Sequence, residues 1–129
     1  MEIQNLEALV KKYQDAIHSQ DKEAFYDLWA KNVTCSLVSV AAQFVGVDNI
    51  YNDFLIGRIQ QRHLSIDLVN DHLDIRILKP DLAIMVFQYH TEAIMRETGL
   101  PGGIQGVETQ VAVKEGNEWK LAHVHYSKI

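Results

Sequence analysis

The sequence predicts an α+β fold in which helices come first and an antiparallel sheet follows. Up to residue 29, and again over residues 48–60, the apolar residues recur mainly at steps of three and four, which is typical of helices. From residue 63 onward they largely alternate with polar residues, which is typical of strands. Helical and strand segments that are separated along the chain favour a layer of helices on one face of a sheet.

Three helices are expected in the first part of the chain. The first ends near His18, and its apolar face is formed by Ile3, Leu6, Val10, Tyr13 and Ile17. The second follows Ser19, which is expected to cap it, and buries Phe25, Leu28 and Trp29. The third spans residues 48–60, after Gly46 interrupts the pattern.

Strands are expected in the remaining segments, and the last two strands form a hairpin around Glu115-Gly116-Asn117. Residues 98–103, which include Pro101 and three glycines, are expected to form a loop. The predicted strands cover residues 33–37, 43–45, 63–69, 73–77, 82–94, 106–114 and 118–127.

Size and charge restrict the classes of function. A chain of 129 residues has the usual length of one domain, so residues 1–129 are expected to form a single unit. The net charge of −5 argues against a nucleic-acid partner, because phosphate binding requires clustered Lys and Arg. No apolar run approaches the roughly 20 residues of a membrane span, and the acidic N-terminus is unlike a signal peptide. We therefore expect a cytoplasmic protein with no membrane partner.

No residue pattern indicates a cofactor. The single cysteine, Cys35, lies on a predicted strand and is expected to be a small buried hydrophobic residue. Gly102, Gly103 and Gly106 do not follow a strand-to-helix pattern, so they are expected to be loop hinges and not a dinucleotide site.

Two sequence motifs resemble a known family. They are the closing run Glu118–Ser127 and the segment Asp21–Phe25, which precedes a Trp, a short strand and Phe44-Val45-Gly46. Together they resemble the SnoaL-like branch of the nuclear-transport-factor-2-like superfamily and, within it, the association domain of calcium/calmodulin-dependent protein kinase II. The resemblance extends from Leu6 to Lys128.

The resemblance implies a cystatin-like cone, in which a strongly curved antiparallel sheet wraps around three N-terminal helices. In this family the open end of the cone commonly holds a small molecule, and the outer face of the sheet commonly forms a homodimer. The kinase domain has cavity arginines at positions that match Tyr89, Gln110 and Tyr126 in this chain. Their replacement implies a neutral, largely apolar ligand.

Strand alternation then assigns residues to the two faces of the sheet. If Gln110 and Tyr126 face the pocket, the inward set also contains Phe87, Tyr89, Thr91, Glu108, Ala112, Ala122 and Val124. The outward set faces the expected partner subunit and contains Gln88, His90, Glu92, Thr109, Val111, Trp119, His123 and His125. A bulge would reverse this assignment locally.

The expected ligand-binding residues combine apolar walls with a few polar groups, as small-molecule sites usually do. They are Tyr13, Trp29, Phe54, Phe87, Glu108, Gln110 and Tyr126. Glu108 is the candidate general base, because burial in an apolar cone would raise its pKa. Tyr89 or Tyr126 could donate a hydrogen bond to an enolate oxygen. In the alternative interpretation, Glu108 has a structural role and pairs with Gln110, Tyr126 or Arg76.

The histidines allow two interpretations. His123 and His125 lie on one face of a strand, and His90 and Glu92 could lie nearby, so a zinc site is conceivable. We expect instead that His90, Thr109, Val111, His123 and His125 belong to the dimer face and bind no metal. His18, His63 and His72 lie in or near connections and are expected to be solvated.

Three functions therefore remain open. The favoured one is a homodimeric domain that binds a small neutral molecule. The second is an isomerase or cyclase that performs acid–base chemistry on a carbonyl compound, with Glu108 as base. The third is a purely structural oligomerisation domain.

Overall fold

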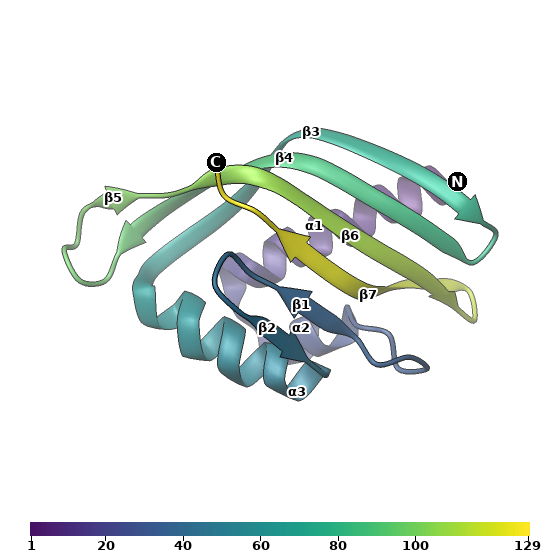
Figure 1. Cartoon of the computed structure of the whole chain (residues 1–129), viewed down its shortest axis with the longest axis horizontal. Coiled ribbons are helices and arrows are strands. Elements are labelled where there is room, and N and C mark those ends of the chain that lie inside the picture. Colours follow the sequence, from purple (N-terminus) through teal and green to yellow (C-terminus); the bar gives the residue numbers. More distant parts are fainter.

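The computed structural model describes residues 1–129 and confirms the α+β fold. A strongly curved sheet covers the long first helix, and the shorter helices close the space beneath the sheet (Figure 1). The 25 buried apolar residues of the core lie in one cluster, which includes Tyr13, Trp29, Phe54 and Phe87. The core is therefore enclosed between the helices and the concave face of the sheet.

The helices begin and end close to the predicted residues. α1 spans Glu2–Ser19 and buries Leu6, Val10 and Tyr13 among others. α2 spans Lys22–Asp27 and is capped by Asp21, whose side chain accepts a hydrogen bond from the Ala24 N–H at 3.0 Å. The prediction of Ser19 as the cap is therefore wrong, since its hydroxyl instead accepts from the Asp21 N–H.

The third helix differs from an ordinary α-helix. A short turn, α3 (Val47–Asn49), continues into η1 (Ile50–Gln60), which is a π-helix. A Cβ atom at Gly57 would lie 3.0 Å from the Asn52 carbonyl oxygen, so a side chain at this position would be tightly packed against the wide turn. η1 directs Phe54 and Ile59 toward the interior of the cone.

The sheet has seven strands, and its main path runs in the order β2-β1-β7-β6-β4-β3. β1 and β7 pair in parallel and the other pairs are antiparallel, so the sheet is mixed. Part of the predicted loop forms β5, which pairs with β4. The strands are β1 (Ser36–Val38), β2 (Gln43–Val45), β3 (His63–Lys79), β4 (Leu82–Met95), β5 (Pro101–Gly102), β6 (Gln105–Glu115) and β7 (Glu118–Tyr126).

Two irregularities change which residues face inward. The two strands predicted at residues 63–69 and 73–77 form one long strand, β3, whose pairing with β4 shifts register between Asn70 and His72. In β7, Val111 pairs with His123 while the next residue, Ala112, pairs with Leu121, so Ala122 is an extra residue. Such a bulge reverses the side-chain alternation beyond it.

The bulge at Ala122 corrects two assignments. Leu121 takes the inward position opposite Ala112 and is fully buried, whereas Ala122 is only half-buried. Trp119 was expected to face outward, but it is only 6% exposed and its indole N–H has no hydrogen-bond partner. Its ring packs beneath the ammonium group of Lys114, which also pairs with Glu2 of α1.

Candidate functional site

A cavity of about 220 Å³ occupies the wide end of the cone. It is bounded by α1, η1, the inner face of the sheet and the C-terminal residues, and it opens beside the exposed Arg62 and Lys128. Most of its lining is apolar. The lining residues are Tyr13, Ile17, Val40, Phe54, Ile59, Arg62, His63, Ile66, Leu68, Tyr89, Thr91, Met95, Gly103, Ile104, Glu108, Tyr126 and Lys128.

Glu108 is the one carboxyl group in this lining. It projects from β6 and is only 2% exposed, and its Oε2 accepts a hydrogen bond from Gln110 Nε2 at 2.8 Å. No cation pairs with it, so burial raises the pKa of Glu108 to about 8, although the Gln110 hydrogen bond opposes the shift. At neutral pH this group is therefore mainly a neutral carboxylic acid that can donate a hydrogen bond from its other oxygen.

Three tyrosines surround Glu108. Tyr89 and Tyr126 pack edge to face with ring centres 6.0 Å apart, and Tyr126 also contacts Phe54. Burial raises the pKa of Tyr126 to about 12, and the pKa of Tyr13 is raised well above its usual value by burial and by the charge of Glu108. All these phenols therefore remain protonated near neutral pH.

The tyrosines differ in how their hydroxyl groups are used. The Tyr89 hydroxyl donates to the Ser127 carbonyl oxygen at 2.7 Å, so its proton is committed to the main chain. The Tyr13 hydroxyl has no hydrogen-bond partner within the chain, although the ring is buried against Trp29. Tyr13 was expected only as a wall residue, and it now offers the free donor that Tyr89 lacks.

The structure brings together five of the expected pocket residues: Tyr13, Phe54, Tyr89, Glu108 and Tyr126. Trp29, Phe87 and Gln110 were expected to line the pocket but lie behind its surface. Trp29 supports Tyr13 from behind, and Gln110 supports Glu108. Their contribution to the site is thus indirect.

The rim residues were missed by the sequence analysis. Arg62 and Lys128 lie just beyond the ends of η1 and β7, where alternation assigns no face. His63 was expected to be solvated, but it is half-buried, lines the cavity, and contacts the Ile59 carbonyl oxygen through Nδ1 at 2.7 Å. Thr91 fixes the opposite rim, since its hydroxyl accepts from the Ile104 N–H at 2.9 Å.

The outer face of the sheet holds the residues expected at a dimer interface. Thr109 lies opposite His125 and Val111 opposite His123, on the side facing away from Glu108 and Gln110. Half-buried aliphatic side chains continue this surface along β4 and β6: Ile84, Val86, Val111 and Val113.

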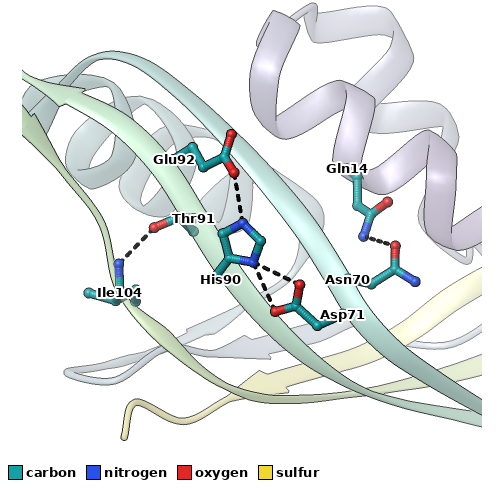
Figure 2. A network of polar contacts seen from close by, with 7 residues as sticks. All are labelled: Gln14, Asn70, Asp71, His90, Thr91, Glu92 and Ile104. Carbon is teal, nitrogen blue, oxygen red and sulfur yellow. Dashed lines mark hydrogen bonds and ion pairs between the residues drawn. The ribbon is translucent and has the colours of Figure 1, made fainter.

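His90 forms the charged border of this face. Figure 2 shows its ring between two carboxylates, with Nδ1 2.8 Å from Asp71 and Nε2 2.8 Å from Glu92. The hydrogen bonds to Asp71 and then Glu92 raise the pKa of His90. His123 behaves in the opposite way, because burial and the neighbouring His125 lower its pKa. No group of three or more His, Cys, Asp or Glu side chains is arranged to hold a metal ion.

The profile of the calcium/calmodulin-dependent protein kinase II association domain matches residues 2–129. The chain belongs to this association-domain family. Membership of an association-domain family is consistent with self-association of this chain. A search of curated proteins found no match.

Several solved structures share the fold of this association-domain protein. A nuclear transport factor 2-like superfamily protein from Salmonella enterica is 23% identical, with a TM-score of 0.89 over 97% of this chain and 89% of the other. A candidate protein of the same association-domain family from Xanthomonas campestris is 19% identical, with a TM-score of 0.80 over 96% and 85%. The hexachlorocyclohexane dehydrochlorinase LinA-type3 from Novosphingobium barchaimii is 10% identical, with a TM-score of 0.86 over 98% and 86%. The fold is therefore nuclear-transport-factor-2-like, and the solved structures that share it include a protein named as a dehydrochlorinase. None of the helices has the length and apolar character needed to cross a membrane.

Proposed function

We propose that this association-domain protein is a homodimer whose cone binds a small molecule with a largely apolar, uncharged buried part. The observation that carries the proposal is an open cavity of about 220 Å³ with one buried carboxyl group, Glu108, and no cation in its interior. Apolar lining with a few converging polar groups is the usual composition of a ligand site. A ligand oxygen at the base of the cavity would accept from the protonated Glu108 and from the Tyr13 hydroxyl.

Filling the cavity should abolish binding. Leu68→Trp places an indole in the lining, whereas Leu64→Trp introduces the same residue on the same strand at an exposed site outside the cavity. With the neutral ketone 2-acetonaphthone as probe, we expect calorimetry to show that Leu68→Trp weakens binding at least about tenfold and Leu64→Trp leaves it unchanged. Equal affinities of both variants and the unmodified protein would refute binding in this cavity.

The outer sheet face is proposed as the dimer interface. Val111 is half-buried at its centre, so Val111→Glu would bury an unpaired charge between two subunits. We expect sedimentation equilibrium to show a dissociation constant raised by roughly 100-fold, which corresponds to about 3 kcal/mol. Val33→Glu, at an exposed valine outside the sheet, should leave the dimer intact. A dimer that resists Val111→Glu does not use this face.

A second candidate function, acid–base catalysis, is favoured by the Tyr13 phenol, which lines the same cavity as Glu108 and lies close enough for the charge of Glu108 to raise its pKa. The ionised Glu108 would take a proton from the carbon beside a carbonyl group, and Tyr13 or Tyr126 would donate a hydrogen bond to the resulting enolate oxygen. The pKa of about 8 caused by burial of Glu108 is suited to such a base.

Deuterium exchange separates binding from catalysis. In D₂O, a catalyst of this kind should replace the methyl protons of 2-acetonaphthone with deuterium, and ¹H NMR would follow the loss of signal. Exchange that the protein accelerates and that Glu108→Gln abolishes would support acid–base catalysis. Binding without acceleration would support a binding module alone.

A further inference from the structure

Two cationic side chains line the mouth of the cavity and a third lies nearby, and none of the three has a carboxylate partner. Arg62 and Lys128 line the mouth, and Arg58 lies one helical turn before Arg62, with its guanidinium over the Phe44 ring at 5.4 Å. Both arginines lie near the Tyr126 hydroxyl, because their charges lower the pKa of Tyr126 against the larger effect of burial. Neither these arginines nor Lys128 forms an ion pair within the chain, whereas Lys11, Arg76, Lys114 and Lys120 all do.

Hydrogen bonds hold the backbone on both sides of the mouth, at Arg62 and at Lys128. Arg96 donates to the Gln60 and His63 carbonyl oxygens, and its backbone N–H donates to the Arg62 carbonyl oxygen. On the other side of the mouth, the Ser127 and Ile129 N–H groups donate to β6 and thereby fix the intervening Lys128. The two walls of the mouth are thus anchored, which reduces the entropy lost on binding a ligand.

The charge at the mouth contrasts with the rest of the protein. The chain carries a net charge of −5, yet the cavity lining contains Arg62 and Lys128 with a single carboxyl group, Glu108, at the buried base. A cleft with apolar walls concentrates the field of such charges and attracts ions of opposite sign. A ligand therefore meets positive charge at the rim, then apolar walls, then neutral hydrogen-bond donors.

We infer that the ligand is an amphipathic organic anion, with a carboxylate held by Arg62 and Lys128 at the rim and an apolar body that ends in a neutral oxygen near Glu108. The inference rests on the proposed function and deepens it by naming the ligand class. It also changes the expectation of a wholly neutral ligand, because the cations lie at the mouth and not at the interior positions of Tyr89, Gln110 and Tyr126.

A matched pair of probes tests whether the rim binds a carboxylate while the interior binds an apolar body. 2-Acetonaphthone supplies the neutral oxygen and the apolar rings, and 6-acetyl-2-naphthoate adds a carboxylate at the opposite end. We expect the carboxylate to bind about tenfold more tightly at low salt, through two charge-assisted contacts. The double variant Arg62→Gln/Lys128→Gln should remove this gain, so that it binds the two probes with affinities within about twofold of each other.

The control variant Lys12→Gln/Lys79→Gln removes the same charge from exposed lysines that do not line the cavity. It should keep the gain of the carboxylate probe. If the ketone binds and the carboxylate is no tighter, or if the control variant loses the gain as well, the rim site is refuted while the proposed cavity stands. If neither probe responds to Leu68→Trp, the proposed function itself fails.

Discussion

Replacing Glu108 with glutamine is expected to remove most of the pH dependence of stability between about pH 5 and pH 9. In the folded protein burial raises the pKa of Glu108 to about 8, well above the value of 4.5 for an exposed glutamate. The folded state therefore binds this proton more tightly than the unfolded state does. Stability from this group is fully present below pH 4.5 and is lost as the pH rises through 8.

The size of the effect follows from the shift. Each pH unit between the two pKa values costs about 1.4 kcal/mol, so the unmodified protein should lose on the order of 5 kcal/mol relative to Glu108→Gln by pH 9. Urea unfolding at several pH values, followed by tryptophan fluorescence, measures the difference. The same substitution at the exposed Glu7 should leave the pH profile unchanged. Parallel profiles for the unmodified protein and Glu108→Gln would show that Glu108 ionises normally.

Truncation of Trp29 is expected to have a similarly large effect. Its ring is 1% exposed and packs against Tyr13 and Phe25, with ring centres 6.4 and 5.8 Å apart. Removing a buried indole costs roughly 3–5 kcal/mol, so Trp29→Ala should destabilise the fold by that amount. It should also weaken binding of 2-acetonaphthone, because Tyr13 would lose its support.

Trp29→Phe provides the matched comparison. The Trp29 Nε1–H is buried without a partner, so the phenyl ring keeps much of the packing and removes an unsatisfied donor. We expect a loss of only about 1–2 kcal/mol in the free energy of unfolding. Equal losses for the two variants would mean that the contacts of the ring with Tyr13 and Phe25 contribute little.

Local pattern was sufficient to predict most elements of the fold. The apolar face of α1 and the hairpin of β6 and β7 have strong periodicity, and their residues pair nearly as expected. The parallel pairing of β1 with β7 was not predictable, because it joins Leu37 to Val124 across most of the chain. The sequence pattern predicts a helix over residues 48–60 but does not distinguish an α-helix from a π-helix. The structure shows that η1 is a π-helix.

The site was predictable where regular alternation applied and unpredictable where it ended. Glu108 and Tyr126 lie on regular parts of β6 and β7, and the structure places both in the cavity lining. Trp119 lies beyond the bulge at Ala122, where no Gly or Pro signals the reversal. Arg62 and Lys128 lie beyond element ends, so only the three-dimensional structure brings them to one rim.

The most direct test of the proposed site is the titration of Glu108 itself. Its carboxyl carbon can be followed by ¹³C NMR, with Glu108→Gln assigning the signal, in the presence and absence of 2-acetonaphthone. A midpoint near pH 8 that moves higher when the ketone is added is the predicted result, since a ligand oxygen would stabilise the protonated acid. A midpoint near pH 4.5 that is unaffected by the ketone would contradict both the buried neutral acid and its contact with a ligand.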